Sequence, residues 1–308
     1  MAVTAEAVKT LRERTGAGMM ECKKALVETN GDLDAAAEMM RKSGLAKADK
    51  KATRVAAEGV IVLERSADGK RAAMVEVNCE TDFVAREKDF QNFASAVAKA
   101  VLEKGPADVA ALGLLPVAGG QAIEETRRAL IAKIGENISV RRFIVLEAPA
   151  VVGAYLHGTR IGALVAMKSG DDAVAKDVAM HVAAINPARV SAAEVPPEEV
   201  AKEKAIFIEQ AAGEPKNAGK PRELLEKIVE GKVRKWLNEV TLLGQPFVKD
   251  DKQSVEQYLK SAGGEVQAIV RYEVGAGIEK KQEDFAEEVR RQVESALDSA
   301  KDKGKGTH

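Results

Sequence analysis

The sequence predicts an α+β protein built from several modules. Segments in which apolar and polar residues alternate, as in a half-buried strand, stand beside segments in which apolar residues recur every three or four positions, as in an amphipathic helix. The order of hairpin, helical segment and closing strand occurs twice, at 59–148 and at 151–274. We therefore expect a core of two related antiparallel-sheet subdomains, each covered by helices.

Length, composition and charge exclude several classes of protein. The 308 residues suffice for about two ordinary domains, and a hydrophobic content of 45% supports real cores. The 47 Lys and Arg nearly balance the 48 Asp and Glu, so the chain has no global attraction to nucleic acid or an anionic membrane. Its two cysteines cannot build a disulfide framework, and neither a signal peptide nor an apolar run near ~20 residues is present. We therefore expect a cytoplasmic protein.

Residues 1–55 are expected to form a three-helix module and a basic linker. Thr4 can cap the first helix and Asp32 the third, and Gly44 is expected to end that third helix. The segment 45–57 combines basic and small residues, which favours a linker. Nucleic-acid binding is the alternative, but no aromatic side chains stand among the basic ones for stacking.

Met19, Met20 and Lys23 lie at the start of the expected second helix. Two methionines beside a positive charge can form a soft apolar contact surface for a partner. The alternative is that the methionines belong to the core and that the lysine lies at its solvated edge. The pattern leaves both interpretations open.

Both halves of the core are expected to begin with a hairpin. In the first half, an Asp-Gly turn at 66–70 joins strands at 59–65 and 71–79, and helices at 88–103 and 121–134 and a strand at 139–148 follow. The second half repeats the plan with strands at 151–156, 161–168 and 265–274 and a helix from Asp171. Helices at 197–212 and 222–240 are predicted to form an antiparallel coiled-coil hairpin.

These patterns define five expected parts of the chain. They are the N-terminal module and linker at 1–55, the first core subdomain at 56–148, the second core subdomain at 149–190 and 240–277, the coiled-coil hairpin at 191–239, and a C-terminal module and tail at 278–308. The last part is expected to contain an amphipathic helix at 283–297. The hairpin's apolar stripe must be buried against its own other arm or against another molecule, so a homodimer through the hairpin or the core is possible.

The segment Thr81–Val84 marks the change from strand to helix. Before it, apolar and polar residues alternate, which predicts a strand with one buried and one wet face: Val75, Val77 and Cys79 against Glu76, Asn78 and Glu80. Phe83 then either packs on the protein's own core as a hydrophobic staple, beside a Thr81 or Asp82 cap, or is offered to a partner. The spacing alone favours the staple.

Candidate catalytic groups are scarce. His157 is expected in a hairpin turn, and His181 lies on an apolar helical stripe, where we expect a hydrogen-bonded core histidine, since no acidic or Cys partner stands at metal-ligand spacing. The segment 213–221 lacks the spacing and the hydroxyl residue of a phosphate loop, and the carboxylates are spread along helix faces. We therefore expect a binding protein with no catalytic residues, no metal and no cofactor.

Several motifs resemble those of bacterial elongation factor Ts, in the same order along the chain. They are Leu11–Leu26, Val77–Ala85, Lys133–Ile138, Tyr155–Gly162, Ala179–Ala183 and Leu243–Val248. The resemblance implies a UBA-like N-terminal three-helix module, a core of two subdomains, a coiled-coil hairpin and a C-terminal module. It also implies a nucleotide-exchange factor that binds the translation GTPase elongation factor Tu in its GDP-bound and nucleotide-free states.

The resemblance assigns the expected contacts and reverses the preference for a staple. It implies that the segment Thr81, Asp82, Phe83 and Val84 inserts beside the nucleotide site of the GTPase and dislocates its magnesium ion, with Asp82 and Phe83 as the wedge. Other contacts with the GTPase would come from the N-terminal module and the core: Met19, Met20, Lys23, Ile134, Gly135 and His157. It implies no direct contact with nucleic acid and none with a membrane.

Three other functions are alternatives to exchange activity. A ribosome-associated or nucleic-acid-binding module would use the basic cluster at 47–54 and the basic tail after Leu297. The aromatic content of 4% and the balanced charge count against it. An interaction adaptor would bind a peptide through the small helical module, and its binding would not depend on Phe83. An enzyme would depend on His157 or His181 in the absence of any GTPase.

Overall fold

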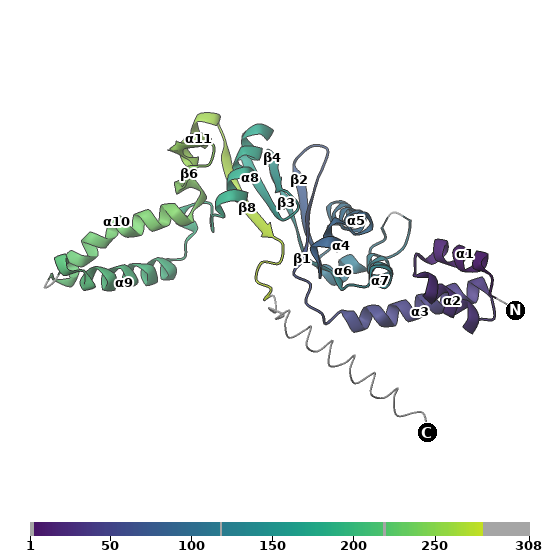
Figure 1. The fold of residues 1–308 in the computed structure, drawn as a ribbon. Helices are drawn as coiled ribbons and strands as arrows, with labels where there is room; N and C mark the ends of the chain where they lie inside the picture. Colours follow the sequence, from purple (N-terminus) through teal and green to yellow (C-terminus); the bar gives the residue numbers. More distant parts are fainter. Residues whose placement is uncertain (1–2, 118, 218–219, 280–308) are drawn as a thin grey trace, which may run out of the picture. The chain divides into compact units, whose positions relative to one another are not determined.

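The computed structural model describes residues 3–117, 119–217 and 220–279 (Figure 1). The chain divides into two units, Met1–Ala276 and Gly277–His308. The C-terminal helix expected at 283–297 lies outside the described residues. The finer boundaries between modules remain a prediction.

The N-terminal module consists of the helices α1 (Ala5–Thr15), α2 (Met19–Glu28) and α3 (Leu33–Lys51). Thr4 caps α1 as predicted, since its hydroxyl accepts the N–H of Ala7 at 3.1 Å. Asp32 caps α3 by accepting the N–H groups of Asp34 and Ala35. The inner faces of the helices form a small core of their own: Val8, Leu11, Cys22, Ala25, Leu26 and Ala36.

The prediction that Gly44 ends the third helix is wrong, because α3 continues to Lys51. The reason is close packing between helices. A Cβ atom at position 44 would lie 2.9 Å from the Cβ of Ala132 in α7 (Ile123–Ile134), so glycine lets the two helices approach. Ala48, one turn further along α3, is buried in the core of the first sheet. Much of the expected linker is therefore a packed helix.

The first sheet has the strand order β1 (Glu58–Arg65), β2 (Arg71–Cys79) and β3 (Ile138–Glu147), and all pairs are antiparallel. The helices α5 (Lys88–Lys104) and α7 pack against it as predicted, and the short helices α4 (Asp82–Arg86) and α6 (Val109–Gly113) are additional. The largest buried side chains of this core come from both layers: Phe90, Leu112, Ile123, Ile131 and Ile138.

The second sheet repeats this plan with the order β4 (Val151–His157), β5 (Ile161–Ser169) and β8 (Glu265–Glu273). The helix α8 (Asp172–Ile185), capped by Asp171, packs on β4 and β5. The helices α9 (Pro197–Gly213) and α10 (Arg222–Val240) run side by side as the predicted hairpin (Figure 1). The mixed α+β fold is therefore confirmed.

The segment between α10 and β8 contains elements that we did not predict. They are the strands β6 (Pro246–Phe247) and β7 (Asp250–Ser254) and the helix α11 (Val255–Ala262). Three short 3-10 helices, η1 (Ala192–Glu194), η2 (Pro215–Asn217) and η3 (Leu242–Gly244), complete the described elements. Reciprocal hydrogen bonds between Ser254 and Gln257 cap α11. None of the described helices combines the length and the apolarity that crossing a bilayer requires.

The expected wet face of β2 is wrong, because Glu76 and Asn78 are both buried. The second sheet covers this face. Side chains from both sheets form one apolar cluster that includes Ile61 and Met74 of the first sheet and Leu164 of the second. The polar positions of this alternating pattern are therefore buried, and a buried carboxylate such as that of Glu76 needs partners inside the protein.

Glu76 is the charge at the centre of this covered face. Its carboxylate accepts bonds from Arg141 at 3.0 Å, from Arg142 at 2.6 Å and from the backbone N–H of Gly275 at 2.8 Å. Burial alone would raise the pKa of Glu76, but the hydrogen bonds from these three groups outweigh it, and the pKa is lowered. The cluster ties the first sheet to the segment that follows β8.

Replacing Glu76 by alanine is expected to destabilise the protein by ~1–3 kcal/mol, because the N–H of Gly275 and two partly exposed guanidinium groups lose their common acceptor. The measurement is the free energy of urea unfolding. The matched control is Glu265→Ala, which removes an exposed ion pair with Lys168 and should cost less than about 1 kcal/mol. Equal effects of the two substitutions would contradict the structural role of Glu76.

The predicted role of His181 as a hydrogen-bonded core histidine is confirmed. Its Nε2 lies 2.9 Å from the amide oxygen of Gln245, and its Nδ1 accepts the N–H of Val248 at 3.2 Å. This arrangement fixes the neutral tautomer with the proton on Nε2, because Nδ1 serves as an acceptor. The ring stacks on Phe247. Burial lowers the pKa of His181.

Stability is expected to decrease as the pH falls below 6.5, the ordinary pKa of histidine. The unfolded chain then binds a proton that the folded His181 resists, so the loss is at most ~1.4 kcal/mol per pH unit for one group. The measurement is the urea midpoint at about pH 7.5 and about pH 5.5. His181→Gln should flatten this dependence, whereas His157→Gln, which changes an exposed side chain, should retain it. An unchanged slope in His181→Gln would refute this origin.

Candidate functional site

The segment Thr81–Val84, which we call the corner, follows directly after strand β2. Thr81 has an extended backbone, and its hydroxyl accepts the N–H of Val84 at 3.4 Å, so it is the N-cap of α4. The thiol of Cys79 donates to the carbonyl of Thr81 at 3.1 Å. Burial raises the pKa of Cys79 to about 12, which keeps the thiol protonated as a donor. The strand end and the helix start are thereby joined into one rigid turn.

Phe83 points away from the protein that carries it. Its side chain is 78% exposed, while Val84 and Ala85 beside it are only 6% and 8% exposed. The capping role predicted for Thr81 is confirmed, but the hydrophobic staple is wrong. A large apolar side chain on a fixed turn gains free energy when another molecule covers it.

Asp82 begins α4 and faces solvent beside Phe83. Its Oδ2 accepts a hydrogen bond from the guanidinium of Arg86 at 2.7 Å, and both side chains of this pair are partly exposed. Exposed pairs at this spacing contribute little to stability. The carboxylate can therefore exchange its arginine for another partner at low cost.

Glu136 holds the corner through hydrogen bonds to its first residue, Thr81. Its carboxylate accepts the backbone N–H of Thr81 at 3.0 Å and the Thr81 hydroxyl at 2.7 Å. No sequence pattern singled out Glu136, although it lies inside the motif Lys133–Ile138. Hydrophobic periodicity carries no signal for a polar clamp of this kind, and only the motif itself pointed to it.

Ile134 and Gly135 lie at the end of α7, directly before Glu136. Gly135 has a φ of 92° and caps α7 in the left-handed conformation. Its carbonyl accepts the ammonium group of Lys51, and Ile134 packs partly buried against the core. The structure therefore brings this expected contact pair next to the corner, with Glu136 as the link.

His157 was predicted in the hairpin turn, but it is the last residue of β4, directly before the turn at 158–160. Its side chain is exposed, and its Nδ1 lies 3.3 Å from the hydroxyl of Tyr155. The same turn binds the first sheet, because Arg160 pairs with Glu58 at 2.6 Å. Glu58 stands opposite Cys79 in the β1–β2 register. His157 therefore lies next to a turn that is bonded to the end of the β1–β2 pair from which the corner emerges.

Met19, Met20 and Lys23 lie on the outer face of α2. Met19 is 47% exposed and Met20 is 76% exposed, while Cys22 is buried on the inner face. The core-methionine alternative is therefore wrong. The two methionines and Lys23 form an exposed surface that combines soft apolar groups with a positive charge.

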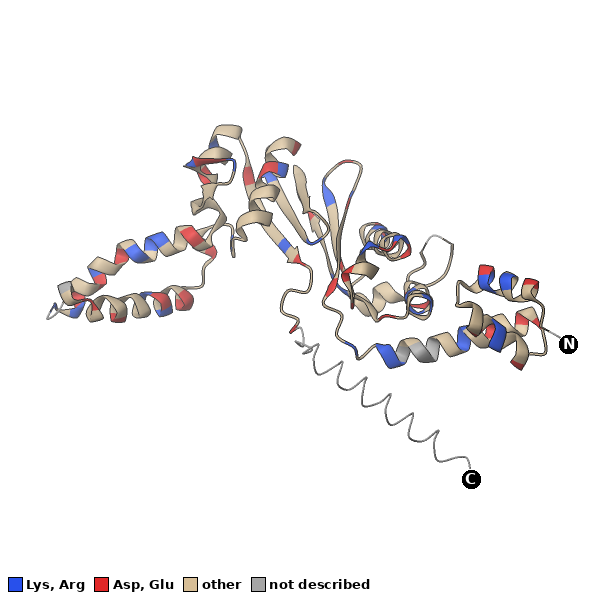
Figure 2. Ribbon diagram, in the orientation of Figure 1, with Lys and Arg blue, Asp and Glu red and all other residues tan. Residues whose placement is uncertain are grey.

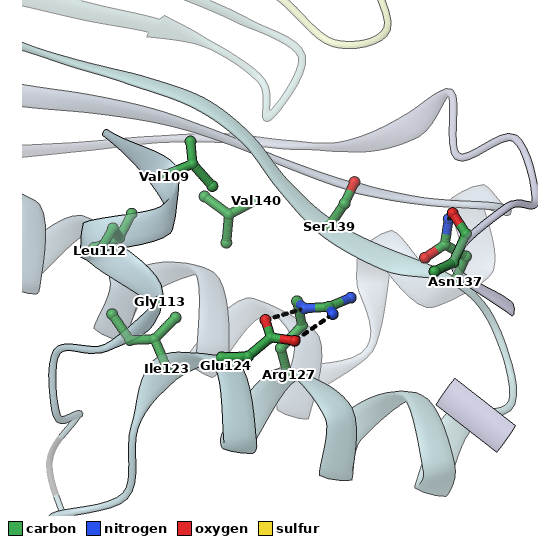
Figure 3. A pocket seen from close by; sticks show the side chains of 10 residues that line it. Val109, Leu112, Gly113, Ile123, Glu124, Arg127, Asn137, Ser139 and Val140 are labelled. Atoms are coloured by element: carbon green, nitrogen blue, oxygen red, sulfur yellow. Dashed lines mark hydrogen bonds and ion pairs between the residues drawn. The ribbon is translucent and has the colours of Figure 1, made fainter. Parts of the chain in front are cut away.

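A cavity of about 280 Å³ lies between α6, α7 and β3 (Figure 3). Val109, Leu112 and Val140 line its apolar end, and Asn137 and Ser139 line its polar end. The cavity also contains an internal ion pair, which Figure 3 shows as dashed lines: Arg127 bonds both carboxylate oxygens of Glu124, at 2.8 and 2.7 Å. Arg127 and Glu124 thus compensate each other's charge within the cavity wall.

Charges of both signs lie along most of the described helices, whereas β4 and β5 carry almost none (Figure 2). Within the described ranges, no group of three or more His, Cys, Asp and Glu side chains stands close enough to hold a metal ion. Cys22 and Cys79 are both buried and free. The features that stand out are apolar side chains fixed on a rigid frame and open to solvent.

Exposed apolar side chains on a rigid frame are typical of proteins that bind a macromolecular partner. The sequence profile described as elongation factor TS matches residues 80–276. Curated relatives are similar over almost the whole chain. Elongation factor Ts of Thioalkalivibrio sulfidiphilus is 57% identical to this chain, and the match covers 96% of this chain and 100% of the relative. Elongation factor Ts of Alkalilimnicola ehrlichii is 55% identical over 95% of this chain and 99% of the relative. Elongation factor Ts of Legionella pneumophila strain Paris is 53% identical over 94% of this chain and 98% of the relative. The chain belongs to the elongation factor Ts family, whose members serve translation elongation.

Proposed function

We propose that this chain is the guanine-nucleotide exchange factor of the translation GTPase elongation factor Tu. Membership of the family and the predicted absence of any reaction centre support this function. The single observation that carries the mechanism is the corner: Phe83 is 78% exposed on a turn that Thr81 and Glu136 fix in place. The corner inserts beside the magnesium and nucleotide site of the GTPase and stabilises its nucleotide-free state.

The mechanism requires differential binding and no catalytic residue. A GTPase that holds nucleotide at nanomolar affinity has ~12 kcal/mol of binding free energy, to which magnesium and the phosphate-binding loops contribute. A wedge that fits only the shifted, magnesium-free state lowers nucleotide affinity by the difference in its own affinity for the two states. The coupling is reciprocal, so incoming nucleotide displaces the factor. The protein is therefore not an enzyme in the chemical sense.

The two wedge residues act in different ways. Phe83 contributes apolar burial, worth ~1.5–3 kcal/mol for a fully covered side chain. Asp82 brings its carboxylate close to the ligands of the magnesium ion. The negative charge of this carboxylate competes with those ligands for the cation or repels them. Val84 anchors the corner, since its side chain is buried in the core of the first sheet.

A wedge of this size needs additional contacts. A ~10⁴-fold loss of nucleotide affinity corresponds to about 5.5 kcal/mol, which exceeds what one phenylalanine supplies. Met19, Met20 and Lys23 are the proposed contacts with the GTP-binding domain, and all three are exposed. His157 is the proposed contact with a different domain, and Ile134 and Gly135 complete the set. We place this exchange in the cytoplasm, with no direct nucleic-acid contact and with homodimer formation as an open possibility.

Replacing Asp82 and Phe83 together by alanine is expected to abolish most exchange and to leave the fold nearly intact, because neither side chain belongs to the core. The measurement is the release rate of a fluorescent GDP analogue from purified elongation factor Tu, at low and ample magnesium, with and without this protein. Wild type should accelerate release by orders of magnitude.

The matched control is Leu114→Ala, since Leu114 is 79% exposed on a different part of the surface. This variant should accelerate release as wild type does. No acceleration by the folded wild-type protein would remove the exchange function and favour the adaptor. Unfolding of the Asp82/Phe83 variant would show that the corner is needed for the fold.

A further inference from the structure

The three consecutive residues Gly135–Asn137, which we call the junction, bond to the part of the chain that leaves the N-terminal module. The carbonyl of Gly135 accepts the ammonium of Lys51, the last residue of α3. The side-chain amide of Asn137 donates to the carbonyl of Arg54 at 2.7 Å. The backbone carbonyl of Gly135 thus holds Lys51 at the end of α3, and the side chain of Asn137 holds Arg54 just beyond it.

The junction also bonds to the corner and to the residue before it. Glu136 accepts two hydrogen bonds from Thr81. The backbone N–H of Asn137 donates to Glu80 at 2.6 Å, and Glu80 in turn pairs with the guanidinium of Arg54 at 3.1 Å. The corner and the exit of α3 are therefore connected through the same three residues by charge-assisted hydrogen bonds.

Packing makes the connection stiff on the side of the N-terminal module. α3 lies against α7, the helix that ends in the junction, with Gly44 allowing close approach to Ala132 and Ala48 buried between the layers. A helix packed in this way cannot shift relative to its neighbour without opening a void or straining side chains. The position of α3 and the position of the junction are fixed together.

We propose that the junction holds the corner at a fixed position relative to α3, so that the N-terminal module and the corner meet the partner as one preorganised unit, with Glu136 as the positioning residue. This inference rests on the proposed exchange function. Glu136 does not touch the nucleotide and acts only through Thr81. An unclamped corner would have to be ordered during binding, and that loss of entropy would weaken its action on the nucleotide site.

The inference predicts a particular pattern for Glu136→Ala. Two hydrogen bonds to a charged acceptor are lost, so amide hydrogen exchange at 81–86 should rise about tenfold or more, while α5 and β2 stay protected. The GDP release rate at saturating factor should fall about tenfold or more. The concentration of factor that gives half of the maximal rate should change by less than about threefold, because the other contact surfaces are intact.

Glu136→Gln should recover most of the rate, because the amide oxygen still accepts the N–H of Thr81 and its N–H₂ can donate to the Thr81 hydroxyl. In a double-mutant cycle, Glu136→Ala should have little further effect once Phe83 is alanine, because both changes act through the corner. Glu125→Ala, which removes an exposed carboxylate from α7, should behave as wild type.

The outcomes separate this inference from the function on which it rests. Failure of wild type to accelerate release would remove the exchange function itself. Acceleration by wild type together with a full maximal rate for Glu136→Ala would leave the function standing and overturn the positioning role. Fully independent effects of Glu136→Ala and Phe83→Ala, or loss of protection in β2 and α5 together with the corner, would also overturn it.

Discussion

The burial of β2 on both faces is the constraint on which the rest of the structure depends. One face carries the core beneath α5 and α7, and the other is covered by the second sheet. A strand in this position cannot leave Glu76 uncompensated, and Arg141, Arg142 and the N–H of Gly275 supply the compensation. The same bonds connect the first sheet to the end of β8. The strand is therefore fixed along its length, and so is the point at which the chain leaves it.

That fixed exit determines what the corner can do. The chain turns sharply after Cys79, Thr81 caps the short helix, and Glu136 satisfies the remaining donors of Thr81. Polar satisfaction and the burial of Val84 together define the turn without any contribution from Phe83. Exposing an aromatic side chain brings the isolated protein no stability. Its position is consistent with selection for a contact outside the chain.

The sequence predicted the elements with strong periodicity and missed those set by tertiary contacts. Both three-stranded sheets, their covering helices and the hairpin of α9 and α10 follow from patterns of period two and period 3.6. Gly44 was misjudged because a glycine that ends a helix and one that lets two helices approach have the same local sequence. The strands β6 and β7 are short, and no periodic signal can develop over their length.

For the candidate site too, local sequence predicted some features and missed those that depend on tertiary contacts. Its geometry was predictable only as far as local chemistry reaches: the capping role of Thr81 follows from its position before the helical period. The direction of Phe83 depends on which face of a single helical turn meets the core, and spacing alone favoured the wrong one. Glu136 is 55 residues from Thr81, and no local pattern connects them.

Under the proposed function, there is an energetic reason for several separate contact surfaces on one rigid frame. A single wedge that bound tightly enough to displace nucleotide unaided would also be slow to leave, because its own affinity would have to carry the whole coupling. Spreading the contacts over α2, the corner and His157 at the end of β4 lets each contact remain weak. Weak contacts act together only when their spacing is fixed, since every loose connection adds an entropic cost to simultaneous binding. A rigid frame with satisfied internal polar groups is therefore as important to such a protein as the side chains that it presents.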